Sequence, residues 1–180
     1  GSYYPYFSGH FDGQGHSIIG LTINRPNDLH VGLFGYVGDA GSIEHVTLTG
    51  GSVTGPTDYD DDLCVGSLAG SNLGTIVDCH SSAEVSGYSA GGLVGFNGST
   101  EEWDWEELPD SATMSNCSFT GTVNGTEAVG GLACANIGTI TQCFTTGLTT
   151  GQWGVGGLAG YNIGMIDQSY ATGETIGEEA

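Results

Sequence analysis

The stretch Val155–Thr175, VGGLAGYNIGMIDQSYATGET, decides the fold, because four earlier parts of the chain repeat its pattern. The copy that begins at Val129 reads VGGLACANIGTITQCFTTGLT. Each copy has an anchor leucine: Leu33, Leu68, Leu93, Leu132 and Leu158, at spacings of 35, 25, 39 and 26 residues. The base period is therefore about 25 residues, which is typical of a solenoid. Two spacings are longer and contain insertions, near residues 56–63 and 98–112.

Equivalent positions of the aligned copies hold similar residues. An asparagine column contains Asn72, Asn97, Asn136 and Asn162. An isoleucine column contains Ile76, Ile140 and Ile166. Apolar and polar positions alternate within each short run, as they do in strands. When parallel strands of successive coils stack about 4.8 Å apart, one residue type lies over itself, so these leucines, asparagines and isoleucines are predicted to form the core.

The fold class that follows is all-β, a right-handed parallel β-helix of about six coils, since parallel crossovers are almost always right-handed. The whole chain, residues 1–180, is one domain. Residues 10–30 form an atypical N-terminal coil, in which Ile19, Leu21 and Ile23 alternate, and residues 31–177 form five repeats. We expect three strands per coil, with φ > 0 corners at the glycines that flank each leucine.

The sequence offers no amphipathic helix to cover the last coil, although terminal repeats of a solenoid normally need a cap. The predicted partners are therefore further repeats or copies of the same chain, which would stack on uncapped ends.

The charge of the chain is one-sided, with 21 acidic residues against one basic residue and a formal net charge of −20. Nucleic-acid binding needs Lys and Arg to displace counterions, so nucleic acid is excluded as a partner. An apolar run of 18 residues is absent from the sequence, which argues against membrane insertion. Self-repulsion of this size favours a salty or calcium-containing exterior.

The runs GGLVGFN, GGLACANIGTI and GGLAGYNIGMIDQSYATG resemble the GLUG motif, named for Gly-Leu-hydrophobic-Gly. The likeness covers roughly residues 10 to 177, and the chain departs from the pattern at Ser67 and Cys134. GLUG repeats occur in bacterial and archaeal cell-surface proteins, including adhesin-like proteins and non-catalytic regions of immunoglobulin A proteases. The resemblance implies an extracellular or cell-surface location with a stalk or adhesion role, and it carries no catalytic residues.

The first insertion is a candidate calcium site, with carboxylates at Asp58, Asp60, Asp61 and Asp62. Calcium binds six to eight hard oxygens, but the spacing does not match an EF-hand loop. A solvated acidic loop is the alternative, and we expect no other cofactor.

The second insertion is a candidate glycan site. Trp103 and Trp105 could stack on sugar rings while Glu102 and Asp104 bond the hydroxyl groups. The alternative is that the tryptophans cover the side of the solenoid.

Cysteines and histidines suggest structure rather than catalysis. Cys79, Cys117 and Cys143 share one column and are expected to fill the core as free thiols. Cys64 and Cys134 lie on another side and could pair only if the fold brings them together. The five histidines are expected to form no nucleophile or metal constellation, and no carboxylate pair lies on a strand face.

The chain is therefore predicted to be a structural or adhesive solenoid segment and not an enzyme. A carbohydrate-binding or carbohydrate-processing β-helix and a subunit of an extracellular filament are the alternatives.

Overall fold

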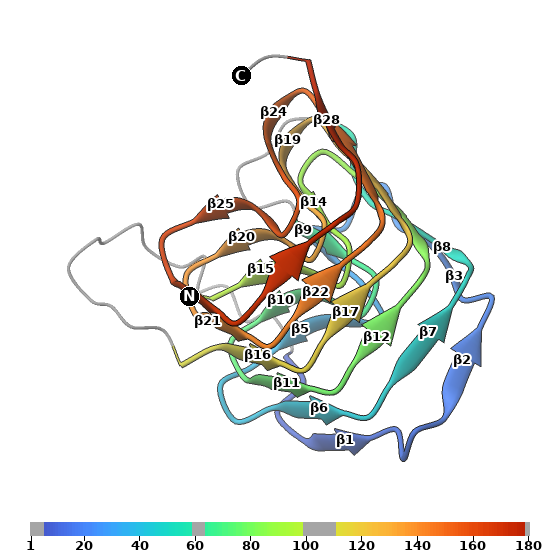
Figure 1. The fold of residues 1–180 in the computed structure, drawn as a ribbon. Helices are drawn as coiled ribbons and strands as arrows, with labels where there is room; N and C mark the ends of the chain where they lie inside the picture. The colour runs from blue at the N-terminus through green and yellow to red at the C-terminus, as the bar shows by residue number, and fades with distance from the viewer. Residues whose placement is uncertain (1–5, 59–63, 99–110, 179–180) are drawn as a thin grey trace, which may run out of the picture.

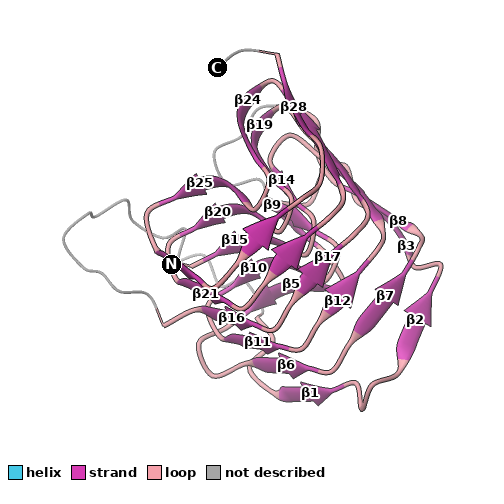
Figure 2. Cartoon of the chain, viewed as in Figure 1, coloured by secondary structure: helices cyan, strands magenta, loops and turns pink. Residues whose placement is uncertain are grey.

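The computed structural model describes residues 6–58, 64–98 and 111–178. Its ordered elements are 28 short strands, and the described residues contain no helix. The strands pair only in parallel, each with its equivalent one coil earlier or later, so the chain winds as a right-handed parallel β-helix (Figures 1 and 2). The predicted fold class is confirmed.

Five sheets run along the helix axis, numbered here in the order in which the chain passes through them. Sheet 1 contains β1 (His10–Asp12), β6 (Ser42–Glu44), β11 (Thr75–Val77), β16 (Thr113–Ser115), β21 (Thr139–Thr141) and β26 (Met165–Asp167). Sheet 2 contains β2 (Ser17–Ile19), β7 (Thr47–Thr49), β12 (His80–Ser81), β17 (Ser118–Phe119), β22 (Phe144–Thr145) and β27 (Tyr170–Ala171). Sheet 3 contains β3 (Thr22–Asn24), β8 (Ser52–Thr54), β13 (Glu84–Ser86), β18 (Thr122–Asn124), β23 (Leu148–Gly151) and β28 (Thr175–Gly177).

The other two sheets have five strands each. Sheet 4 contains β4 (His30–Val31), β9 (Cys64–Gly66), β14 (Ala90–Gly91), β19 (Glu127–Gly130) and β24 (Trp153–Gly156). Sheet 5 contains β5 (Phe34–Val37), β10 (Ala69–Asn72), β15 (Val94–Asn97), β20 (Ala133–Asn136) and β25 (Ala159–Asn162). Coil 1 is β1 to β5, each later coil takes the next five strands, and coil 6 consists of β26 to β28.

A coil has five strands, not the predicted three, because it bends at more places than the glycines. The corner between sheets 1 and 2 is made by non-glycine residues in the left-handed region, with φ between 48° and 55°: Gln14, His45, Asp78, Asn116, Gln142 and Gln168. Asn, Asp and His tolerate this region better than most side chains. The sequence gave no glycine signal for this corner, so two strands were predicted as one.

The glycines that flank the anchor leucines answer to space rather than to φ, which corrects the prediction. They are absent from the residues with positive φ among the described part of the chain. A Cβ on Gly130 would lie 1.8 Å from the carbonyl oxygen of Ala133, and one on Gly91 would lie 2.0 Å from that of Val94. The backbone turns too tightly between sheets 4 and 5 for any side chain to fit.

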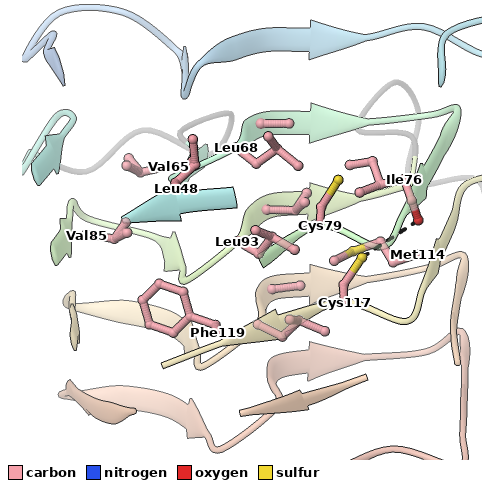
Figure 3. Packing of buried hydrophobic residues seen from close by; sticks show 14 of the residues in the cluster. Leu48, Val65, Leu68, Ile76, Cys79, Val85, Leu93, Met114, Cys117 and Phe119 are labelled. Atoms are coloured by element: carbon pink, nitrogen blue, oxygen red, sulfur yellow. Dashed lines mark hydrogen bonds between the residues drawn. The ribbon is translucent and has the colours of Figure 1, made fainter. Parts of the chain in front are cut away.

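The anchor leucines form one row along the interior. The N–H of Leu68 donates to the carbonyl of Leu93, that of Leu93 to Leu132, and that of Leu132 to Leu158, at 2.8–2.9 Å. Leu68, Leu93 and Leu132 are fully buried, while Leu33 and Leu158 in the outer coils are partly buried. Figure 3 shows Leu68 above Leu93, and Cys79 above Cys117 beside them.

The asparagine column is a buried hydrogen-bond ladder. The side-chain amide of Asn72 donates to the amide oxygen of Asn97 at 2.8 Å, Asn97 donates to Asn136 at 2.7 Å, and Asn136 donates to Asn162 at 2.7 Å. Within the described residues, every buried side-chain nitrogen and oxygen has a partner. The ladder therefore places polar groups in the core without leaving them unsatisfied, which would cost about 1–3 kcal/mol each.

Ile76, Ile140 and Ile166 stack in sheet 1 as in-register partners of neighbouring strands. In the N-terminal coil the inward positions are Ile18, Leu21 and Ile23, which pack against the core, whereas Ile19 is 78% exposed. The expected alternation fails at Ile19 because Gly20 turns the chain with φ of 69°.

Candidate functional site

Most of the sequence-predicted ligand-binding residues lie outside the described part of the chain. Asp58 is exposed at the edge of the first insertion. Asp60, Asp61 and Asp62 fall outside the described residues, and so do Glu102, Trp103, Asp104 and Trp105. The calcium site and the glycan site both stay predictions.

A different group of cation-binding side chains lies on the outer surface of the first two coils. Strands β1 and β6 pair in register, with His10 opposite Ser42 and Asp12 opposite Glu44. One ligand atom from each of His10, Asp12 and Glu44 lies within 4.8 Å of the others. The expectation that no histidine joins a metal constellation is therefore wrong for His10.

Neighbouring polar groups orient these side chains. Ser42 Oγ lies 2.7 Å from His10 Nδ1, and His10 Nε2 lies 3.0 Å from Glu44 Oε1. The backbone N–H of Gln14 donates to Asp12 Oδ1 at 2.8 Å. Outer hydrogen bonds of this kind fix which atoms of a ligand face a metal. An imidazole and two carboxylates suit a divalent cation that would keep several waters.

His45 completes this surface from the corner after β6. Its Nδ1 lies 2.9 Å from Asp12 Oδ1. The hydrogen bond to Asp12 raises the pKa of His45 above its usual 6.5. The pKa of Asp12 is lowered, first by the bond from the Gln14 N–H and then by the bond with His45. The two groups therefore stabilise each other in their charged forms.

A sequence signal for this group exists in the repeat alignment. Phe11 pairs with Ile43 of the isoleucine column, so FDGQ of the first coil aligns with IEHV of the second. That alignment puts Asp12 against Glu44, and it was missed because the N-terminal coil was treated as atypical.

The two ends of the β-helix differ. At the N-terminal end, Phe7 forms a parallel bridge to Val37 and its ring lies 5.0 Å from that of Phe34, centroid to centroid. Phe11 meets the same ring edge-on at 5.3 Å. Aromatic side chains therefore cover part of this end.

The C-terminal face consists of the outer edges of β24 to β28. Its inward side chains Val155, Leu158 and Ile166 are only partly buried, although their counterparts one coil earlier, Val129, Leu132 and Ile140, are almost completely shielded from solvent. Around this face several large apolar side chains are exposed: Trp153, Tyr161, Met165, Tyr170 and Ile176.

None of the described residues forms a helix that is long and apolar enough to span a bilayer.

Comparison with known proteins places these repeats. The family model of the GLUG motif matches residues 86–124 and 151–177. The resemblance predicted from the sequence is confirmed for these segments.

Two curated relatives are similar over part of the chain. Halomucin of Haloquadratum walsbyi is 42% identical over 90 residues, which are 49% of this chain and 1% of that protein. A Gly-rich membrane protein of Evansella cellulosilytica is 39% identical over 70 residues, which are 39% of this chain and 8% of that protein. The chain thus spans a small fraction of the length of either relative.

A solved structure shares the fold. It is described as that of a candidate immunoglobulin A1 protease from Bacteroides ovatus, and it superposes with a TM-score of 0.63 at 24% identity. The match covers 91% of this chain and 52% of that one.

Proposed function

We propose that this GLUG-repeat β-helix is a rod-like structural segment of a large secreted or cell-surface protein, and that a further coil of the same kind covers its C-terminal face. In this role the chain holds other parts of the protein at a distance and catalyses no reaction. Adhesive contact with glycans through Trp103 and Trp105 stays a prediction from the sequence.

The carrying observation is the state of the inward columns at the C-terminal face. Leu158 and Ile166 continue the buried rows, yet they are left partly exposed. A coil of about 25 residues with the same pattern would bury them, and each leucine that becomes buried contributes roughly 1.5–3 kcal/mol. Asn162 likewise offers its amide to a next member of the ladder.

The backbone of β27 prepares this face for pairing. The N–H groups of Tyr170 and Thr172 donate back to Cys143 and Thr145 of coil 5 at 3.1 and 3.0 Å. Because successive N–H groups of a strand point to opposite sides, the N–H of Ala171 faces away from coil 5.

The known relatives support a surface location and a long parent protein. Their names describe a mucin-like protein and a membrane protein, and the matched segments are small parts of each. The net charge of −20 agrees with an acidic exterior surface.

The experiment appends a second copy of residues 151–177 after Ala180 and compares it with the original chain. If the added coil stacks, amide exchange at Ala171 should slow by about 100-fold or more, because the N–H enters a parallel ladder. The melting temperature should also rise. An added segment without exchange protection, together with unchanged exchange at Ala171, would refute the proposal.

A matched pair of proline variants provides the control. Ala171→Pro removes a donor that faces the open side, so it should leave the original chain nearly as stable, since edge strands tolerate proline. It should cancel much of the gain in the extended chain. Thr172→Pro breaks the bond to Thr145 and should destabilise both forms. If the original chain instead grows into long assemblies in sedimentation velocity, a second copy covers the face and the filament alternative holds.

A further inference from the structure

Two cysteines that lie 70 positions apart in the sequence are brought together at the junction of sheets 4 and 5. Cys64 begins β9 in coil 2, and Cys134 belongs to β20 in coil 4. Both are about 2% exposed, and they form a small buried cluster with Ala135 and the partly buried Phe96. Both are free thiols in the structure.

The glycine column of the motif explains how side chains from two non-adjacent coils can meet. Cys134 stands in sheet 5 at the position held by Gly35, Gly70, Gly95 and Gly160 in the other coils. The intervening coil contributes Gly95 there. A Cβ on Gly95 would lie 2.8 Å from the Cβ of Cys64. Cys64 therefore lies over a position that has no side chain, and the next position along the axis is Cys134.

The ionisation of the two thiols reports their contact. The hydrogen bond from the Cys134 thiol is the main cause that lowers the pKa of Cys64 to about 6, and His30 and Ser71 also contribute. The same contact, together with burial, raises the pKa of Cys134 well above 9.0. One sulfur thus acts as acceptor and the other as donor.

The three column cysteines are arranged differently. The Sγ atoms of Cys79, Cys117 and Cys143 donate to the carbonyl oxygens of the residues two positions earlier, at 3.3, 3.2 and 3.2 Å. Those thiols are engaged with the backbone of their own coils, as reduced core cysteines would be.

We propose that Cys64 and Cys134 are a modification site, at which oxidation forms a disulfide that ties coil 2 to coil 4 across coil 3. Extracellular proteins keep such bonds. Small movements of the two side chains would be needed, because a disulfide joins Cβ atoms about 3.8 Å apart.

The reaction is thiol–disulfide exchange with a small-molecule disulfide, during folding and before both sulfurs are buried. The Cys64 thiolate attacks one sulfur of the reagent and expels its other half as a thiolate. Deprotonated Cys134 then attacks the Cys64 sulfur of this mixed disulfide and releases the second half. Two protein thiols lose two protons and two electrons, and the reagent is reduced to two thiols.

The test refolds the full chain with oxidised glutathione, alkylates it in denaturant without reductant and maps the peptides. The expected product is lighter by about 2 Da before alkylation, carries labels on Cys79, Cys117 and Cys143, and yields a linked Cys64–Cys134 peptide. Five labelled cysteines, or a bridge within the column, would overturn the proposal. Both outcomes can be read even if the chain is only partly folded.

A variant that restores the motif is the matched control. Cys134→Gly places the usual glycine in its column and leaves Cys64 alone. Oxidation should raise the melting temperature of the original chain by about 10 °C, because the bridge closes a long loop in a domain of this size. Oxidation should leave the melting temperature of Cys134→Gly unchanged. An equal rise in both would show that the effect does not come from this bridge. The assay uses the chain alone, so its result is independent of the proposed surface role.

Discussion

Single side chains in this β-helix are tuned mainly by the equivalent residues of the next coil. Asn97 lies between Asn72 and Asn136 and satisfies both through one amide group. Asp12 and His45 likewise belong to neighbouring coils and share a hydrogen bond. Contacts between stacked coils thus determine which polar groups can be buried or charged.

The Asp12–His45 pair should make part of the stability depend on pH. The raised pKa of His45 means that its contribution is fully present below about pH 6.5 and is lost as the pH rises through the raised value. The lowered pKa of Asp12 gives a contribution that is present above about pH 3.8 and lost as the pH falls through the lowered value. The pair therefore contributes most between these two limits.

An NMR titration of the imidazole of His45 checks this expectation. In Asp12→Asn the pKa of His45 should fall toward 6.5, because the main cause of its shift is removed. Asp39→Asn removes one carboxylate whose hydrogen bond goes to the backbone of Ala40, so it serves as the control for net charge. A His45 pKa that is the same in all three proteins would contradict the assignment.

At the level of elements, the strands are two to four residues long and are defined by the corners between them. The corner between sheets 4 and 5 has a backbone so compact that the glycine before each anchor leucine has no room for a Cβ. This explains the first Gly of the repeated Gly-Gly-Leu pattern without appeal to unusual φ.

Gly130→Ala should therefore destabilise the protein by about 3 kcal/mol or more, since its Cβ would lie 1.8 Å from the Ala133 carbonyl oxygen and the backbone would have to move. Gly35→Ala is the control. Its Cβ would meet only the carbonyl oxygen of His30 at 3.3 Å, and we expect a change within about 1 kcal/mol. Urea unfolding measures both, and equal losses would show that the compact corner is not the cause.

The sequence predicted the stacking of elements well and their corners poorly. Repetition with a period of about 25 residues was enough to place Leu93 over Leu132 and Asn97 over Asn136, because parallel coils must superpose equivalent positions. The corner at Asp78 or Gln142 carries no such signal, since ordinary residues adopt the left-handed conformation there. The contact of Cys64 with Cys134 depends on the bare Gly95 between them, which a comparison of column positions alone does not reveal.

The whole molecule is a short rod with strong negative charge, 21 acidic residues against one basic residue. Such a surface repels itself at low ionic strength, and salt shortens the range of that repulsion from about 30 Å at 0.01 M to about 3 Å at 1 M. The stability of the chain should therefore depend on the concentration of ions around it.

We expect the melting temperature at pH 7 to rise by more than about 5 °C between 0.01 M and 1 M sodium chloride. The same comparison near pH 4.1, the isoelectric point, serves as the control because the net charge there is close to zero. The rise should be much smaller at that pH. A similar rise at both values would mean that the salt acts through water and not through charge.

The exclusively parallel pairing has a consequence for how the chain could be made. Each coil bonds only to the coils before and after it, so an N-terminal coil supplies a complete template for the next one as soon as about 25 more residues are available. A chain exported with its N-terminus first can thus build its structure progressively outside the cell while the remainder is still threading through the secretion channel. Only the link between coil 2 and coil 4 has to wait for a more distant part of the sequence to arrive.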